Sequence, residues 1–190
     1  MVSDERRALF LDRDGVINID SGYIWRPEDF IFNDGVFDAC RKARNLGYLL
    51  VVVTNQAGIG RGLFSEKDFR ALTAWMIGRF AEEAIEIAQV YFAPTHPEEG
   101  VGVYRRESSD RKPGPGMLFK ARDEFGIDMK ASAIIGDRET DILAGINGGV
   151  GRRILIEGTE PDTSQTRADV VVSSLAEGVD WLVRQRGRPS

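Results

Sequence analysis

The sequence has little thiol or imidazole chemistry to offer. Its single cysteine forbids an internal disulfide, and its single histidine, His96, disfavours a histidine nucleophile or a multi-histidine metal centre. Cys40 is followed six residues later by Leu46, where the cysteine phosphatases need an arginine. Because Cys40 also continues the helical apolar pattern of Val36 and Ala43, we interpret it as a core residue. Any catalysis is therefore expected to use carboxylates.

Long apolar runs and an excess of positive charge are also missing. The longest apolar run, Tyr48 to Val53, is far too short to span a bilayer. The segment from Met1 to Arg7 carries acidic residues where a signal peptide has apolar ones. We therefore expect a cytoplasmic protein with no membrane partner. A formal net charge of −5 argues against a nucleic-acid partner.

The composition is that of one globular domain. A chain of 190 residues, with 42% hydrophobic and 29% charged residues, can bury one substantial core. We predict a single domain over residues 1–190 that acts as a monomer. Residues 184–190, which are rich in arginine, are expected to form a flexible, solvated tail.

Short apolar runs alternate with helical patterns along the chain. The predicted strands cover residues 8–11, 48–53, 89–93, 131–135, 153–156 and 169–172. Asp34 is predicted to cap one helix, and a capping box of Ser65 and Asp68 to open a longer one. Further helices are predicted over residues 117–125, 139–147 and 175–183. This alternation predicts an α/β fold with a doubly wound, Rossmann-like parallel sheet, which binds ligands beyond the carboxyl ends of its strands.

The first predicted strand ends at two aspartates separated by one residue. In extended backbone, Asp12 and Asp14 lie on the same side, while Arg13 faces elsewhere and Gly15 lets the chain turn. Two converging carboxylates need a shared proton or a cation, and Mg²⁺ is the natural occupant. The alternative is an ordinary turn with an Asx hydrogen bond. A calcium loop fits poorly, because the glycine comes too early for an EF-hand.

Three further motifs lie near predicted strand or loop ends: V-T-N at residues 53–55, R-K-P at 111–113 and G-D-x-x-x-D at 136–141. Together with D-x-D-G at 12–15, and in this order, they resemble the haloacid dehalogenase-like phosphohydrolase superfamily. The match spans most of the chain. The intervals between the motifs are too short to hold a second core, so no large cap domain is expected.

The resemblance implies a phosphoryl transfer in two steps. Asp12 would be the nucleophile that forms an aspartyl-phosphate, and Asp14 would protonate the leaving group and then take a proton from water. Thr54 and Lys112 would bind the phosphoryl oxygens. Each has an ordinary alternative, since Thr54 can merely end a strand and Lys112 can be a surface lysine.

The resemblance also implies Mg²⁺ as the cofactor. Asp12, the backbone carbonyl of Asp14 and Asp137 would hold the ion, and Asp141 would lie in its outer shell. Asp137 and Asp141 could instead favour a helix N-terminus through its dipole.

Within this superfamily, the loops most resemble the D-glycero-D-manno-heptose-1,7-bisphosphate 7-phosphatase family. Members of that family remove one phosphate from a bisphosphorylated heptose. The shared motifs are N-x-D-x-G-Y from residue 18, V-V-V-T-N-Q-A-G-I from residue 51, R-G-x-F from residue 61 and R-K-P-x-P-G-M from residue 111. This resemblance predicts a phosphorylated sugar as the substrate. The predicted substrate contacts are Arg13, Asp20, Gly22, Tyr23, Asn55, Gln56, Arg61, Arg111 and Arg138. Of these, Arg61, Arg111 and Arg138 are candidates for binding a second phosphate.

Alternative functions remain open from the sequence. Histidinol-phosphate phosphatases share the catalytic motifs but usually differ in the first loop and after T-N-Q, and another small phosphate ester is a less favoured substrate. The 3′-phosphate end of DNA is disfavoured by the acidic charge. A phosphosugar sensor without activity should have lost an aspartate or the lysine, and none is lost.

The sequence departs from the family at one feature. Family members generally hold the third loop with a structural zinc bound by C-x-H and C-x-C motifs. The matching positions here are Ala93, Thr95, Ser108 and Asp110, so no thiolate is left. We predict that no structural zinc is bound and that His96 is a turn residue.

Overall fold

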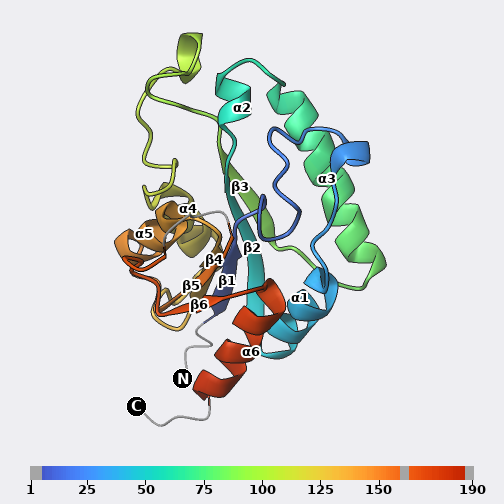
Figure 1. Cartoon of the computed structure of the whole chain (residues 1–190), viewed down its shortest axis with the longest axis vertical. Coiled ribbons are helices and arrows are strands. Elements are labelled where there is room, and N and C mark those ends of the chain that lie inside the picture. Colours follow the sequence, from blue (N-terminus) through green and yellow to red (C-terminus); the bar gives the residue numbers. More distant parts are fainter. Residues whose placement is uncertain (1–5, 159–162, 187–190) are drawn as a thin grey trace.

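The computed structural model describes residues 6–158 and 163–186, which are built around one six-stranded parallel sheet (Figure 1). The strand order is β3-β2-β1-β4-β5-β6, which confirms the predicted doubly wound sheet. The strands are β1 Arg7–Leu11, β2 Tyr48–Asn55, β3 Gln89–Ala93, β4 Ala133–Gly136, β5 Arg152–Ile156 and β6 Val170–Val172. The strand order switches direction next to β1, so a crevice is expected at its carboxyl end.

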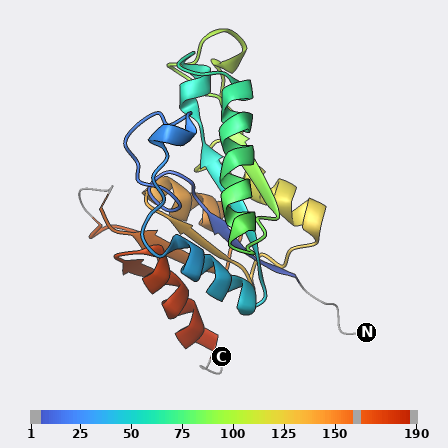
Figure 2. The same cartoon turned by 90° about the vertical axis from the view of Figure 1, so that its right-hand side faces the viewer.

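Helices cover both faces of the sheet. On one face lie α1 Val36–Asn45, α3 Glu66–Glu82 and α6 Leu175–Arg186, which Figure 2 shows in front of the strands. On the other face lie α4 Gly116–Phe125 and α5 Glu139–Asn147. Each helix therefore buries its apolar side against one of two cores.

The residues of β1 divide between these two cores. Leu9 and Leu11 pack with the α1, α3 and α6 side, whereas Ala8 and Phe10 pack with the α4 and α5 side. All four are fully buried, as the continuous apolar run predicts. Cys40 is also fully buried, which confirms it as a core residue, and burial raises the pKa of its thiol to about 12.

Two helix ends differ from the sequence predictions. Asp34 does not cap α1, because the N-cap is Gly35, which takes a left-handed conformation at φ 73° and offers no side chain. The last helix continues to Arg186 rather than ending at Val183, because its buried stripe, which includes Val179 and Leu182, holds it on the core. The predicted tail thus starts inside α6, and residues 187–190 lie outside the described part. The capping box of Ser65 and Asp68 at α3 is confirmed.

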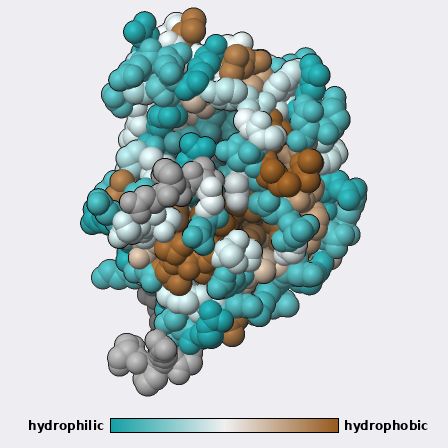
Figure 3. Space-filling model, viewed as in Figure 1, coloured by the Kyte–Doolittle hydropathy of each residue, from teal (hydrophilic) through white to brown (hydrophobic). Residues whose placement is uncertain are grey.

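The loops beyond the carboxyl edge carry only short helices. These are η1 Pro27–Asp29, α2 Ala57–Gly60 and η2 Gly102–Tyr104. No separate cap domain is present among the described residues, as predicted. No helix in this part of the chain is both long and apolar enough to cross a membrane. On the face drawn in Figure 3, hydrophilic residues predominate and the apolar ones form separate patches, as on an ordinary folded surface.

Candidate active site

Four predicted catalytic or metal-binding residues meet at the carboxyl edge of the sheet. Asp12 directly follows β1, Thr54 is the last residue but one of β2, and Asp137 directly follows β4. Lys112 arrives from the loop before α4. All four residues are buried. Parallel strands bring their carboxyl ends to one edge, and for this reason Asp12, Thr54 and Asp137 come together although they are 42 to 125 positions apart along the chain.

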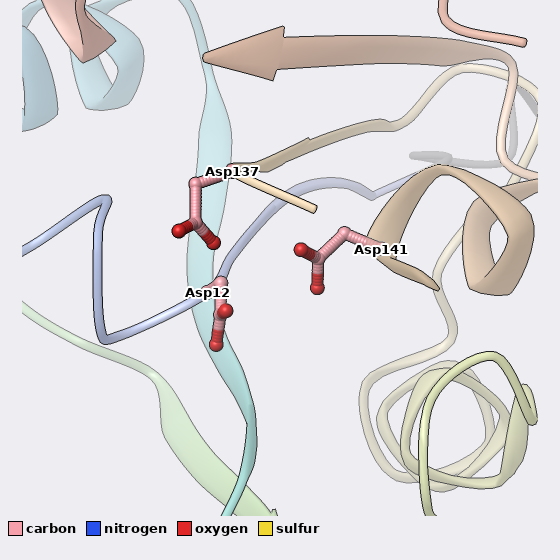
Figure 4. A group of neighbouring side chains, drawn as sticks. All are labelled: Asp12, Asp137 and Asp141. Carbon is pink, nitrogen blue, oxygen red and sulfur yellow. The ribbon is translucent and has the colours of Figure 1, made fainter. Parts of the chain in front are cut away.

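Three carboxylates form a compact cluster at this edge. One oxygen each of Asp12, Asp137 and Asp141 lies within 4.8 Å of the others, and all three residues are buried. Figure 4 shows them entering the same space from β1, β4 and the first turn of α5. The sequence interpretation placed Asp141 only in the outer shell of a metal, whereas here its oxygen belongs to the cluster. Buried carboxylates repel each other, and oxygen-only donors of this kind suit a hard divalent cation.

Lys112 contacts two carboxylates of this cluster, Asp12 and Asp141. Its ammonium lies 2.9 Å from Asp12 Oδ1 and 2.5 Å from Asp141 Oδ1, and it donates to the Val53 carbonyl at 2.8 Å. The side chain of Asn55 fixes the backbone of Lys112, because it accepts from the Lys112 N–H at 2.9 Å and donates to its carbonyl at 3.1 Å. The lysine is therefore rigidly held and is not a surface residue.

Burial and the neighbouring charges shift the pKa values of Asp12 and Lys112. It raises the pKa of Asp12 to about 8, an effect that Lys112 opposes and that Asp141, Asp137 and Asp14 reinforce. Burial alone would lower the pKa of Lys112, but Asp12 and Asp141 outweigh it and raise that pKa. The nucleophile candidate is thus poorly ionised until more positive charge arrives.

Asp14 is held apart from the cluster by its own set of donors. Arg13 contacts both of its oxygens, at 2.9 and 3.0 Å, and Asn18 donates to Oδ1 at 3.0 Å. The prediction that Arg13 faces elsewhere is wrong: its guanidinium folds back onto Asp14 and also donates to the Ile24 carbonyl at 3.1 Å. β1 ends at Leu11, so the alternation of an extended strand no longer applies at these positions.

Two glycines let the carboxylates approach the backbone. A Cβ on Gly15, whose φ is +85°, would lie 2.2 Å from Asp137 Oδ2. A Cβ on Gly136 would lie 2.2 Å from the Cβ of Asp141. Asp141 Oδ2 also accepts from the backbone N–H of Arg138 at 3.1 Å and thereby caps α5. Its helix-capping role and its place in the cluster therefore coexist.

The cluster opens into a cavity of about 510 Å³. All nine predicted substrate contacts line it, namely Arg13, Asp20, Gly22, Tyr23, Asn55, Gln56, Arg61, Arg111 and Arg138. Sequence reasoning missed Ile24, Ala57, Gly58 and Thr140, which also line it. Ile24 directly follows a recognised motif, so extending that motif by one residue would have found it. Ala57, Gly58 and Thr140 lie inside recognised motifs and could have been included with them.

Three arginines surround the cavity with different partners. Arg61 pairs with Glu99, and its guanidinium lies 5.5 Å from the centre of the Tyr23 ring. Arg138 pairs with Asp20 at 3.1 Å. Arg111 donates to the Thr95 carbonyl at 3.3 Å, and both burial and the nearby Arg61 lower its pKa, while Glu99 and Glu107 oppose this. Arg111 is the member of this trio for which the described residues show no ion pair.

The positions that match the zinc ligands of relatives make other contacts. Ser108 Oγ accepts from the backbone N–H of Asp110 at 3.2 Å, and Asp110 pairs with Lys120 at 2.5 Å. Ala93 and Thr95 are buried. His96 accepts backbone N–H bonds from residues 98 and 99 through Nδ1, which confirms it as a turn residue. The expected absence of zinc remains a prediction.

Sequence comparison decides the family. The HAD-hydrolase-like family matches residues 109–178. The chain is 51% identical to the D-glycero-alpha-D-manno-heptose-1,7-bisphosphate 7-phosphatase of Burkholderia mallei over 94% of each chain. It is 44% identical to the D-glycero-beta-D-manno-heptose-1,7-bisphosphate 7-phosphatase of Escherichia coli K12 over 96% of each chain. The chain belongs to the D-glycero-D-manno-heptose-1,7-bisphosphate 7-phosphatase family.

Solved structures of this heptose-bisphosphate phosphatase family share the fold. The D,D-heptose 1,7-bisphosphate phosphatase of B. bronchiseptica, complexed with magnesium and phosphate, matches with a TM-score of 0.78 at 25% identity, over 94% of this chain and 99% of that one. A HAD-like phosphatase from Mesorhizobium loti matches with a TM-score of 0.83 at 31% identity, over 98% and 90%. The predicted superfamily and the closer family resemblance are both confirmed.

Proposed function

We propose that this chain is a Mg²⁺-dependent phosphatase that hydrolyses the 7-phosphate of D-glycero-D-manno-heptose 1,7-bisphosphate. The observation that carries the proposal is that Asp12, Asp14 and Lys112 line one cavity at the carboxyl edge of the sheet, where β2 and β4 also bring Thr54 and Asp137, in a chain of this family. These residue types supply what phosphoryl transfer needs: a nucleophile, a proton donor, a cation site and donors for the equatorial oxygens.

The chain's own residues divide the reaction into two steps. An oxygen of Asp12 attacks phosphorus, the bond to the sugar oxygen breaks, and Asp14 gives its proton to the departing alkoxide. Asp14 then takes a proton from water, the water oxygen bonds to phosphorus, and the bond to Asp12 breaks. Thr54 donates to a phosphoryl oxygen, and Lys112 exchanges one of its three contacts for another phosphoryl oxygen, which stabilises charge that develops on them.

The carboxylate cluster fits Mg²⁺. Three buried carboxylates that lie within 4.8 Å of one another repel each other, and their oxygens are the donors that Mg²⁺ prefers. Asp12, Asp137 and the backbone carbonyl of Asp14 would hold the ion, with Asp141 supporting it. The bound ion would neutralise charge between the nucleophile and the phosphate.

The arginines around the cavity suit the second phosphate of the substrate. Arg111 makes no ion pair with a carboxylate among the described residues, and Arg61 lies near enough to affect its pKa. A guanidinium binds phosphate in a bidentate manner. Arg111 and Arg61 would hold this phosphate, while Arg138, Asp20, Gly22, Tyr23 and Asn55 would border the sugar.

The nucleophile assignment is tested with Asp12→Asn. The variant should fold and bind phosphate esters but show no turnover, because an amide does not form the acyl phosphate. Phosphatase activity with Mg²⁺ and circular dichroism measure both properties. Full activity of Asp12→Asn would refute the assignment.

The substrate assignment needs a panel. Both anomers of the heptose 1,7-bisphosphate, fructose 1,6-bisphosphate and histidinol phosphate are compared by kcat/KM at saturating Mg²⁺. We expect the heptose to be preferred over histidinol phosphate by more than about tenfold, since only the bisphosphate has a second phosphate and each charged hydrogen bond to it contributes about 1.5–3 kcal/mol. A clear preference for histidinol phosphate would overturn the substrate but not the chemistry.

A further inference from the structure

The amide of Gln56 lies between two groups of the proposed reaction and bonds to both. Its Nε2 donates to Asp14 Oδ2 at 3.0 Å and to Thr54 Oγ1 at 2.9 Å. The family resemblance predicts a substrate contact at this position, and the residue borders the cavity. Yet only 4% of Gln56 is exposed. Both N–H groups of the amide are therefore already used inside the protein.

The amide fits in one orientation. The NH₂ end of the amide faces Asp14, because its Nε2 donates to Asp14 Oδ2. Thr54 Oγ1 accepts the second N–H of the same group, which leaves the hydroxyl proton of Thr54 to donate to a phosphoryl oxygen. A single side chain thus orients both a hydroxyl and a carboxylate oxygen.

The backbone of Gln56 is fixed on both sides. Its N–H donates to the Ala93 carbonyl at 2.8 Å, and its carbonyl accepts from the Ile59 N–H at 3.1 Å. The residue stands between the end of β2 and the start of α2. The amide therefore projects from a rigid part of the sheet edge and not from a mobile loop.

The two oxygens of Asp14 have different numbers of donors. Oδ1 accepts from Arg13 Nε at 3.2 Å, from Arg13 Nη2 at 2.9 Å and from Asn18 at 3.0 Å. Oδ2 accepts from Arg13 Nη2 at 3.0 Å and from Gln56. Oδ2 keeps more room for a proton, so it is the oxygen suited to exchange one with the substrate. Gln56 sets the direction of this oxygen.

We infer that Gln56 is a positioning residue that acts through Asp14 and Thr54 and not through the sugar. This inference rests on the proposed function, because it requires Asp14 to be the acid and base. Removing the amide of Gln56 should lower kcat more than it raises KM, and this loss of kcat should appear with any phosphate ester.

The test compares Gln56→Met and Gln56→Glu with wild type on two esters that lack the sugar, 4-nitrophenyl phosphate and propyl phosphate. Gln56→Met removes both donors at similar size, and we expect kcat to fall by about 10²-fold, which is typical of a misplaced catalytic group. The loss should be greater for propyl phosphate, because its alkoxide needs a proton more than nitrophenolate does. Gln89→Met, the same change on β3 outside the cavity, is the matched control and should keep wild-type activity.

The outcomes separate this inference from the function it builds on. If wild type hydrolyses no phosphate ester, the proposed function fails. If wild type is active and Gln56→Met hydrolyses both small esters at the wild-type rate, only the positioning role is overturned. If circular dichroism shows that Gln56→Met does not fold, the same activities are measured with Gln56→Glu, which keeps the shape of the side chain but cannot donate both hydrogen bonds. A loss of kcat on both esters supports the positioning role, and wild-type rates overturn it.

Discussion

Replacing Lys112 by methionine removes the cation from the carboxylate cluster while keeping the length of the side chain. Asp12 at 2.9 Å, Asp141 at 2.5 Å and the Val53 carbonyl at 2.8 Å all lose this partner. Breaking a buried ion pair from one side costs about 3–5 kcal/mol. For a domain of this size each kcal/mol lowers Tm by roughly 2–4 °C. Without metal, Lys112→Met should therefore melt roughly 6–20 °C below wild type.

The size of this effect should depend on pH through Asp12. The pKa of Asp12 in the metal-free fold is raised to about 8, so its protonated form stabilises the fold and that contribution is lost as the pH rises through about 8. At pH 6 Asp12 carries a proton and Lys112 pairs mainly with Asp141. At pH 9 Asp12 has lost its proton, and its charge needs the lysine. The difference in Tm between wild type and Lys112→Met should thus be larger at pH 9 than at pH 6.

Calorimetry in EDTA at the two pH values measures the effect. Lys120→Met is the control, because Lys120 also pairs with a carboxylate, Asp110, but is 56% exposed at its side chain. Exposed pairs contribute about 0–1 kcal/mol, so this control should melt within a few degrees of wild type. A Lys112→Met protein that matches the control at pH 9 would refute the account of the cluster. With Mg²⁺ present, its kcat should also fall by about 10²–10³-fold through the lost phosphoryl donor.

Four further outcomes are expected. Gly15→Ala should abolish turnover and cost more than about 1 kcal/mol in thermal unfolding, since its Cβ would lie 2.2 Å from Asp137 Oδ2 at φ +85°; an active, stable variant would contradict this. Removing Mg²⁺ with EDTA should stop turnover, and the rise in Tm that Mg²⁺ produces should be larger at pH 9 than at pH 6, because the ion competes with the Asp12 proton, whose pKa is about 8. Arg111→Ala should raise KM for the bisphosphate by about 10–100-fold but barely affect 4-nitrophenyl phosphate, and equal losses on both would count against its role. Cys40 should resist thiol reagents until the protein unfolds, because it is buried and its pKa is about 12; rapid labelling of the native protein would show otherwise.

Local patterns in the sequence account for most of the fold. The continuous apolar run before Asp12 predicted a strand buried on both faces, and the Ser65 and Asp68 pattern predicted a helix start that the structure contains. Once the strands are parallel, the meeting of Asp12, Thr54 and Asp137 follows from topology alone, because each stands at a carboxyl end. The location of the site was therefore predictable without any knowledge of side-chain packing.

The pairing of side chains inside the site was not predictable in this way. Asn55 bonds to Lys112, 57 positions away in the sequence, and Gln56 bonds to Asp14, 42 positions away. Neither contact produces a periodic pattern in the sequence. Arg13 was expected to face away, yet its guanidinium lies 5.7 Å from the Phe69 ring and bonds to Asp14. Such contacts depend on how loops fold over the strand ends and on which rotamers then fit, and no local rule encodes them.

The charges of the cluster explain why one lysine does not complete the site. Asp12, Asp137 and Asp141 can carry three negative charges within a small volume, and Lys112 brings positive charge to Asp12 and Asp141. In the metal-free protein a proton on Asp12 reduces the imbalance, in agreement with the raised pKa. A divalent cation brings positive charge to the same carboxylates without that proton, and the proposed nucleophile Asp12 can attack only as a carboxylate. Cation binding and ionisation of Asp12 are thus linked through charge, and the cation-bound cluster would repel less strongly the phosphate that Asp12 is proposed to attack.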